Sequence, residues 1–413
     1  MVKLIASLKE HPTHALAISA ALTLARAAFA QLPPSQTLSP QDMQSARAEI
    51  ARLEHLAQTA PDRCAVVDEI ARTWAFAGQY PETIAALRDV VALNAGFDIA
   101  RDKVFAKLKG APQFEALVEQ AREATPPIHT SQPAFKISEG DLVPENLAYD
   151  PATREFFFGS TTKNKIVRCT SAGICRPFAT GLGTVFGLKV DPVTRTLWAT
   201  SNSSNSTNAS GLFHYDLASG NLIRKFTLTG AHIFNDLVVT QAGDVFVTDT
   251  RAGAVYRLRH TSGDLEILPG AEKLTAANGI ALSPDQTRLY VASFGDGISL
   301  VDPASGKTQP IARPPNVCLA NIDGLYAYRR SLIAIQNGPM TPRVVRLHLD
   351  STRDRIVRLE VLERRNPIFD GVTTGVLTGR DFYFVANMQD DKPAGARFDP
   401  LTVLRIALKP NTE

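Results

Sequence analysis

One pattern recurs six times in the C-terminal two-thirds of this 413-residue chain. Each copy has a first residue that is polar in five of the six, a small or polar neighbour, an alternating apolar segment, a turn, and a second short apolar segment. The copies begin at Glu145, Phe186, Asn235, Asn278, Asp323 and Asp370. Successive copies start 41 to 49 residues apart. Alternating apolar residues between turn dipeptides predict short antiparallel strands, so each copy predicts one small sheet.

A period of this length with about four strands per unit is typical of a β-propeller blade, because a twisted sheet buries its faces only against its neighbours. Six copies predict an all-β, six-bladed propeller over residues 133–409. The last copy has only three strands after its start, ending with residues 401–408. We therefore expect residues 133–140 to supply its outer strand and close the ring without a long free edge.

The region before the propeller has a different texture. Residues 41–124 are rich in Ala, Leu, Arg and Glu, with apolar residues three or four apart, which predicts helices. Within them, residues 70–91 (IARTWAFAGQYPETIAALRDVV) resemble one tetratricopeptide repeat. Because a solenoid needs about three repeats, we expect a small all-α domain that caps the propeller or offers a groove to a protein partner. The prolines in residues 125–132 predict a linker.

The N-terminus has the features of a signal peptide. Residues 1–30 place lysines before an apolar run and end in Ala-Phe-Ala. This predicts a periplasmic or secreted protein, and the run is too short for stable membrane insertion after cleavage. Arg26 leaves open a membrane anchor or a helix of the fold. The whole chain has 44 basic and 41 acidic residues, which gives no reason to expect nucleic acid as a partner.

Four cysteines allow at least one disulfide. Cys169 and Cys175 flank a turn in a predicted hairpin, where an exported protein can keep a bridge. The alternative is a pair of buried thiols. Cys64 lies in the helical region and Cys318 in the propeller, so the sequence gives no reason to pair them and does not tell whether they are free.

The first strand of each blade lines the central channel, so the residues that begin the six copies should converge on one axis. Five of these six residues carry a side-chain oxygen. Carboxylates held close together repel unless protons or a cation compensate. Oxygen ligands without His or Cys suit Ca²⁺ best and Mg²⁺ or Mn²⁺ next, with Zn²⁺ as a further alternative. A single Asn-Gly or Asp-Gly would indicate only a turn, but recurrence at the blade period favours a metal site.

Three segments carry a resemblance to a known family. They are residues 232–250 (HIFNDLVVTQAGDVFVTDT), 276–293 (AANGIALSPDQTRLYVAS) and 321–337 (NIDGLYAYRRSLIAIQN). With them the chain resembles the regucalcin and gluconolactonase-like propellers of the senescence marker protein type. The resemblance implies that Glu145, Asn278 and Asp323 ligate one divalent cation and that Asn235 contacts the substrate or a metal-bound water. The chain departs from the family at residues 144–147, which read Pro-Glu-Asn-Leu where the family usually has Glu-Gly-Pro and an aromatic residue.

The resemblance implies a metal-dependent hydrolase of a small lactone or related ester, in which the cation polarises the carbonyl while water attacks. Asp323 is the candidate general base, or it only orients the water. Asp236 and Asp370 are secondary candidates for which a turn or strand-anchoring role is the simpler reading. His232 is a candidate proton shuttle or an ordinary loop residue. The polar insert at residues 201–211 has the composition of a lid.

A second hypothesis is a non-catalytic periplasmic binding or scaffold propeller with a structural metal, in which the helical domain recruits a partner. A synthase of the strictosidine synthase type is the least favoured reading. The sequence leaves the substrate, the native metal and the oligomeric state open.

Overall fold

The structure is a computed structural model that describes residues 40–58, 60, 62–203, 210–393 and 395–409. The predicted signal peptide and the centre of the 201–211 insert lie outside the described residues. Within the described ranges, no helix is both long enough and apolar enough to cross a membrane.

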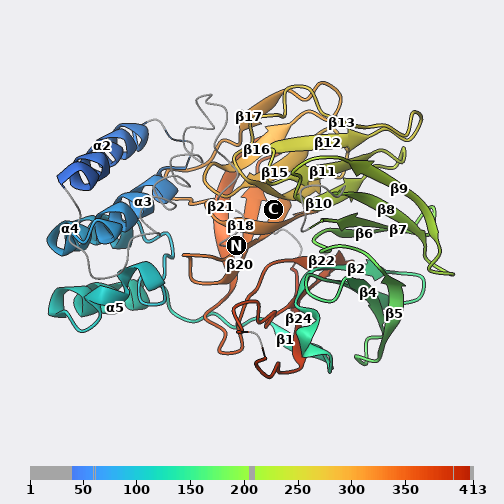
Figure 1. The fold of residues 1–413 in the computed structure, drawn as a ribbon, viewed down its shortest axis with the longest axis horizontal. Coiled ribbons are helices and arrows are strands. Elements are labelled where there is room, and N and C mark those ends of the chain that lie inside the picture. The colour runs from blue at the N-terminus through green and yellow to red at the C-terminus, as the bar shows by residue number, and fades with distance from the viewer. Residues whose placement is uncertain (1–39, 59, 61, 204–209, 394, 410–413) are drawn as a thin grey trace.

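The propeller consists of six antiparallel sheets of four strands each (Figure 1). From the channel outward, the strands of blades 1 to 3 are β2 (Pro144–Asp150), β3 (Glu155–Ser160), β4 (Lys165–Cys169) and β5 (Cys175–Thr180); β6 (Leu188–Asp191), β7 (Thr196–Ser201), β8 (Ser210–Asp216) and β9 (Leu222–Leu228); and β10 (Phe234–Val239), β11 (Val245–Asp249), β12 (Ala254–Leu258) and β13 (Leu265–Ile267). Those of blades 4 to 6 are β14 (Ala277–Leu282), β15 (Leu289–Ser293), β16 (Gly297–Val301) and β17 (Thr308–Pro310); β18 (Ile322–Tyr328), β19 (Ser331–Gln336), β20 (Arg343–Leu349) and β21 (Ile356–Arg364); and β22 (Gly375–Thr378), β23 (Asp381–Val385), β24 (Leu401–Ala407) and β1 (Gln132–Ile137). The six-bladed fold predicted from the repeat is therefore confirmed.

The ring closes through the strand expected from the sequence. β1 pairs antiparallel with β24 and forms the outer edge of blade 6. A short 3₁₀ turn (Gly140–Leu142) then leads into β2 of blade 1. The inner strands follow one another around the channel, with β2 lying between β22 and β6. Blades 6 and 1 are thereby joined by continuous chain as well as by packing.

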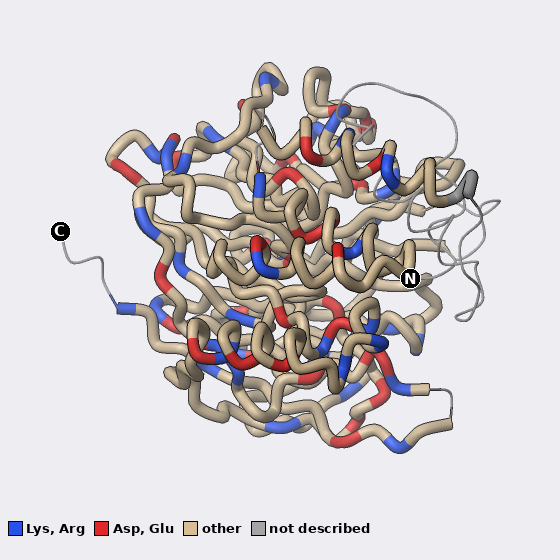
Figure 2. The backbone as a smooth tube through the Cα atoms, turned by 90° about the vertical axis from the view of Figure 1, so that its left-hand side faces the viewer, with Lys and Arg blue, Asp and Glu red and all other residues tan. Residues whose placement is uncertain are grey.

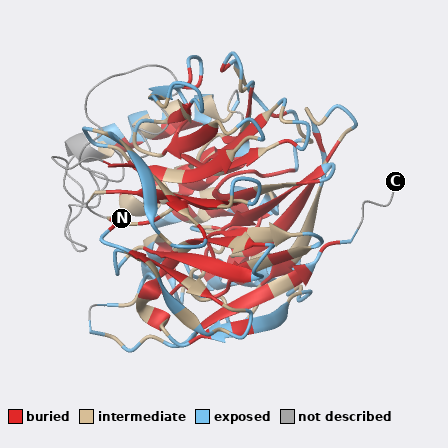
Figure 3. Ribbon diagram, turned by 90° about the vertical axis from the view of Figure 1, so that its right-hand side faces the viewer, coloured by how far each residue is buried: buried red, intermediate tan, exposed pale blue. Residues whose placement is uncertain are grey.

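The core lies between neighbouring blades. Phe135 of blade 6 packs against Phe156 and Phe158 of blade 1, and all three side chains are buried. Figure 3 shows the buried strands running through the interior, while loops and many outer-strand residues are exposed. Each fully buried aromatic or aliphatic side chain contributes about 2–3 kcal/mol of hydrophobic free energy, so the interfaces between blades hold the ring together.

The helical region consists of α2 (Pro40–Leu56), α3 (Arg63–Phe76), α4 (Tyr80–Ala92), a 3₁₀ helix η2 (Lys103–Leu108) and α5 (Pro112–Ala124). α3 and α4 form a hairpin, and Gly78 in the turn between them has a φ of 68°. This left-handed conformation suits glycine and ends α3. Phe105 and Phe114 fill the core of the helical region.

The helical region docks against blade 5 (Figure 1). Its core continues into the propeller through Cys318, Ala320 and Met340. The linker that follows runs along β21, where Ile128 bridges Arg364 and the amides of residues 130 and 131 donate to Glu363 Oε2. Figure 2 shows basic and acidic residues interspersed over this face. The helices therefore cover one side of the propeller.

Candidate functional site

Four inner strands carry the same irregularity at the same place. The register between first and second strands shifts between Pro144 and Leu147, Phe234 and Leu237, Ala277 and Ile280, and Ile322 and Leu325. Such a shift is typical of a β-bulge, which inserts an unpaired residue and turns side chains in a new direction. The residues inside these shifts include Glu145, Asn235, Asn278 and Asp323. Four blades therefore place their candidate residue at an equivalent position at the start of an inner strand.

The sixth position differs from the one predicted. In blade 6 the paired strand begins at Gly375, just as it begins at Leu188 in blade 2. Two residues before these points lie Thr373 and Phe186. The repeat predicts Asp370 at this position, but Asp370 is exposed, forms an isolated bridge with Asn387 and is followed by a bend at Gly371, whose φ is 76°. This irregular segment lies before the strand, so the alignment of Asp370 with the other candidates is wrong.

Asp323 is one of two buried candidate acids, together with Asp236. Its side chain is buried, and Asn337 Nδ2 donates a 2.6 Å hydrogen bond to Asp323 Oδ2. Burial raises the pKa of Asp323 to about 6, hydrogen bonds from Asn337 and Asn278 oppose that rise, and the charges of Asp236 and Asp390 add to it. Asn278 is buried as well, and its Oδ1 finds no hydrogen-bond partner among the described residues. One amide oxygen is therefore orphaned beside a carboxylate.

Glu145 faces the same group of charges. The residue is half-buried, and Thr373 and Thr374 donate to its backbone carbonyl. Burial and then the nearby charges of Asp323, Asp390 and Asp236 raise the pKa of Glu145 well above its usual value. Within the described part of the chain, neither Glu145 nor Asp323 forms an ion pair with a basic side chain. These two carboxyl groups, where the inner strands begin, are thus not neutralised by a basic side chain of the described residues.

Asp236 ties three inner strands together. It accepts hydrogen bonds from Leu237 N (2.8 Å), Ile280 N (3.3 Å) and Asn146 Nδ2 (3.2 Å). Burial raises the pKa of Asp236 to about 6, whereas the charge of Lys189 and these hydrogen bonds lower it. The arrangement fits the strand-anchoring role. Asn146, one of the residues at which the chain departs from the family pattern, is one of its partners.

Asn235 and His232 are held at the start of β10. Asn235 is half-buried, and its Nδ2 donates to Thr250 Oγ1 at 3.1 Å. His232 Nδ1 lies 2.6 Å from Asp249 Oδ2, and its ring stacks on Phe234. The hydrogen bond with Asp249 raises the pKa of His232. His232 is therefore a fixed side chain with its own buried partner.

A cavity of about 480 Å³ occupies the channel beyond these residues. Its walls come from later positions of the inner strands, including Leu147, Ile280 and Val376, with Lys189 and Tyr326 among its polar groups. Asn146 and Asp236 also line it, whereas Glu145, Asn278 and Asp323 do not. The predicted ligands therefore lie nearer the end of the channel where the inner strands begin.

Two residues near the acidic group were missed in the sequence. Asn337 directly follows β19, and the pairing of Ile322 with Gln336 brings the end of β19 back to the start of β18. Pairing the two predicted strands of residues 321–337 as a hairpin would have placed Asn337 next to Asp323. Asp390 lies in the irregular segment after β23, and a Cβ added to Gly371 would lie 2.7 Å from Asp390 Oδ1. No repeat signal marks Asp390, because the connection between β23 and β24 is longer than the corresponding connection in the other blades.

Both cysteine pairs form disulfides. Cys169 and Cys175 join β4 to β5, and Cys64 joins the start of α3 to Cys318 in the loop before β18. The second bridge connects residues 254 positions apart, a pairing for which the sequence offered no signal.

Comparison with known proteins agrees with this geometry. Residues 143–302 match the family described as SMP-30/Gluconolactonase/LRE-like region, which covers Glu145, Asn235 and Asn278. The resemblance seen in the sequence is confirmed over these residues, and the chain forms a six-bladed propeller preceded by a helical region. No curated protein matches the chain.

Several solved structures resemble part of this chain. The PQQ-bound aldose sugar dehydrogenase of Streptomyces coelicolor is 15% identical, with a TM-score of 0.50, and the match covers 68% of this chain and 99% of that chain. A gluconolactonase from Xanthomonas campestris is 16% identical (TM-score 0.46; 68% and 98% covered). The calcium-binding protein regucalcin from Agrobacterium tumefaciens is also 16% identical (TM-score 0.49; 67% and 96% covered). At these identities the likeness concerns the fold alone.

Proposed function

We propose that this protein is a cation-dependent hydrolase of a small lactone or related ester, acting where the inner strands begin. The observation that carries the proposal is the orphaned Oδ1 of Asn278 beside Asp323 and Glu145, two carboxyl groups that no basic side chain of the described chain offsets. A buried acidic group of this kind is unfavourable unless a cation or protons compensate it.

The residues fit a hard divalent cation. Glu145 and Asp323 offer carboxylate oxygens, and Asn278 offers the amide oxygen that lacks a partner. Such ligands favour Ca²⁺, then Mg²⁺ or Mn²⁺, while Zn²⁺ would prefer the nitrogen or sulfur that this set lacks. When bound, the cation would polarise the carbonyl oxygen of an ester and offset the negative charge that develops on it.

The chain's own groups would supply orientation and proton transfer. Asn337 donates to Asp323 Oδ2, which fixes the orientation of the carboxyl group toward an attacking water. Without a cation the pKa of Asp323 is about 6, and a bound cation would lower its basicity. Asn235, fixed by Thr250, would orient the substrate from blade 3. Asp323 would act as the base or would only position the water.

We also propose that the protein is exported. The composition of residues 1–30 and the two disulfides support this, because disulfides persist mainly in oxidising compartments.

A panel of aldonolactones and aryl esters, assayed with Ca²⁺ and with chelator, tests the hydrolase. We expect cation-dependent turnover, and at least about a 100-fold loss of kcat in Asp323→Ala and Asn278→Ala. Asp370→Ala, an exposed aspartate of the same channel end, is the matched control and should retain activity. If the wild-type protein turns over no substrate of the panel with any divalent cation, yet a protein co-purifies through the helical region, the binding-propeller hypothesis replaces this one.

A further inference from the structure

Asp323 and Asn337 stand at the same end of one hairpin. Asp323 is the second residue of β18, and Asn337 directly follows β19. Two loops leave the hairpin there, residues 311–321 before β18 and residues 337–342 after β19. The helical region contacts both loops, so it touches the chain on either side of this hydrogen-bonded pair.

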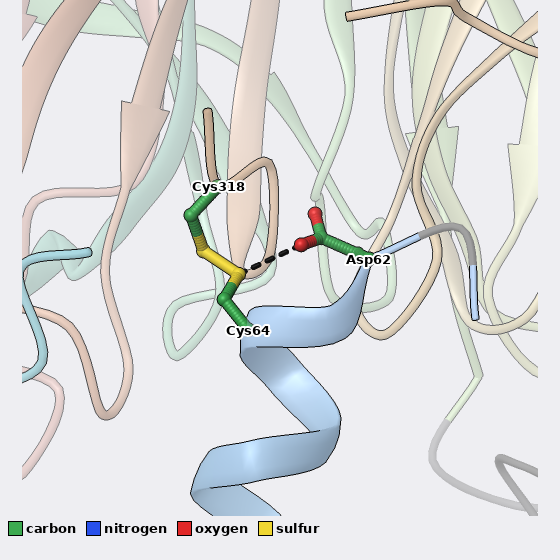
Figure 4. A group of neighbouring side chains, drawn as sticks. All are labelled: Asp62, Cys64 and Cys318. Carbon is green, nitrogen blue, oxygen red and sulfur yellow. Dashed lines mark hydrogen bonds between the residues drawn. A yellow bond between two sulfur atoms is a disulfide. The ribbon is translucent and has the colours of Figure 1, made fainter. Parts of the chain in front are cut away.

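The first loop is held by the start of α3 (Figure 4). Cys64 forms a disulfide with Cys318, which lies five residues before Asp323. Asp62, buried against Cys64, accepts a 2.7 Å hydrogen bond from the backbone amide of Leu319. Arg313 of the same loop lies 3.5 Å from Asp62 Oδ1. One covalent bond, one backbone hydrogen bond and one ion pair therefore fix this loop to the helical region.

The second loop is held by the segment after α4. Phe97 and Met340 form an antiparallel bridge. Asp98 N donates to the carbonyl of Pro339 at 2.9 Å, and Thr341 N donates to the carbonyl of Gly96 at 2.7 Å. Backbone bonds therefore clamp the chain within two to four residues of Asn337.

A buried polar network joins the two loops beneath these contacts. Gln336 Nε2 donates to the carbonyls of Cys318 (3.2 Å) and Ala320 (2.7 Å), and Gln336 Oε1 accepts from Arg343 Nε at 2.8 Å. Gly96 packs directly over Arg343, because a Cβ there would lie 2.7 Å from Arg343 Nη1. A shift of the helical region would therefore displace the start of β18 and the end of β19 together.

The cluster of Asp62, Cys64 and Cys318 is a structural connection between the helical region and blade 5, and it is not a second metal site. Their ligand atoms lie within 4.8 Å of one another. The two sulfur atoms are bonded to each other, however, and a disulfide offers no thiolate to a metal. The carboxylate instead serves the backbone amide of the loop.

We propose that the helical region is a positioning part of the channel site: Asp62 and the Cys64–Cys318 disulfide set where Asp323 and Asn337 stand relative to Glu145 and Asn278. The consequence for cation binding rests on the proposed function, whereas the mechanical coupling does not. Asp62 is a positioning residue, since it acts through the loop and belongs to the helical region.

Asp62→Asn and Cys64→Ala/Cys318→Ala in the full chain test this proposal. Cys169→Ala/Cys175→Ala is the matched control, because it removes the other disulfide, which lies in blade 1. Hydrogen exchange followed by mass spectrometry should show faster exchange at residues 318–326 and 337–341 in the test variants and not in the control. Titration calorimetry should show Ca²⁺ affinity falling about 10-fold or more, as for the loss of groups that orient metal ligands.

Unchanged exchange at residues 318–341 in a folded Asp62→Asn protein would overturn the proposal. Because Asp62→Asn changes the side chain least, exchange can still be measured in this variant even if Cys64→Ala/Cys318→Ala fails to fold. If the wild-type protein binds no Ca²⁺, the proposed function fails, and the exchange rates alone then decide the positioning role.

Discussion

Asp323 and Asp236 are buried carboxyl groups with very different surroundings. Asp236 has two backbone amides, Asn146 and the charge of Lys189 around it, whereas Asp323 has the amide groups of Asn337 and Asn278 and other acids. Both have a pKa of about 6, with burial as the largest cause. The environment of Asp236 suits it to hold strands together, whereas that of Asp323 suits it to bind a cation.

These raised pKa values predict how stability depends on pH without a cation. The native carboxyl groups keep their protons up to about pH 6, while the unfolded ones lose them near 3.8. The native state therefore binds more protons between these values, and stability falls as the pH rises through this window. Between pH 5 and pH 7.5 the loss is about 1 kcal/mol per group.

Thermal unfolding in chelator and in excess Ca²⁺ checks this expectation. In chelator, Tm should be lower at pH 7.5 than at pH 5. Ca²⁺ should restore it at pH 7.5, because a ligand that binds only the native state stabilises that state. A Tm in chelator that rises from pH 5 to pH 7.5, with no response to Ca²⁺, would contradict the assignment.

At the scale of the strand, glycines let neighbouring inner strands approach closely at the channel end where they begin. A Cβ added to Gly279, next to Asn278, would lie 2.2 Å from the carbonyl oxygen of Asp323. A Cβ added to Gly187 would lie 2.3 Å from the carbonyl of Asn235. These two glycines, which follow Asn278 and Phe186, therefore allow close backbone approach between blades in addition to any turn propensity.

Gly279→Ala should force β14 away from β18 and separate Asn278 from Asp323. We expect a loss of about 1–3 kcal/mol in the free energy of unfolding, as for overpacking, together with weaker cation binding. Gly379→Ala is the control: its φ of 63° makes alanine unfavourable by about 1 kcal/mol, but its Cβ would meet no atom within 4 Å. Equal Ca²⁺ affinity in both variants, measured calorimetrically, would show that the close approach does not matter.

The strands also show what the sequence could predict. The blade period located the inner strands of five blades, because in each the first residue of the copy lies two positions before the first regularly paired apolar residue. Blade 6 departs from this, since Asp370 and Gly371 imitate the start of a strand three residues before the equivalent position, Thr373. Asn337 and Lys189 were missed because the repeat was aligned on first positions only.

Across the whole molecule, the two disulfides constrain the chain to different extents. The Cys64–Cys318 disulfide closes a loop between residues 254 positions apart, whereas the Cys169–Cys175 disulfide closes a loop between residues 6 positions apart. Loop-closure entropy predicts about 5 kcal/mol of stabilisation from the first and about 2 kcal/mol from the second. The long-range pairing was invisible in the sequence because it depends on where the helical region docks.

Urea unfolding of the two double-alanine variants measures this difference. Cys64→Ala/Cys318→Ala should unfold at a clearly lower urea concentration than Cys169→Ala/Cys175→Ala. Equal midpoints would indicate that the docked helical region gains nothing from its covalent connection to blade 5.

The central claim is that Glu145, Asn278 and Asp323, which are far apart in sequence, bind one divalent cation where the inner strands begin. Calorimetric titration of the wild-type protein and of Asn278→Ala with Ca²⁺ tests it most directly. We predict about one equivalent bound by the wild-type protein and an affinity at least about 10-fold lower in the variant. No binding by the wild-type protein, or the same affinity in both, would contradict the claim.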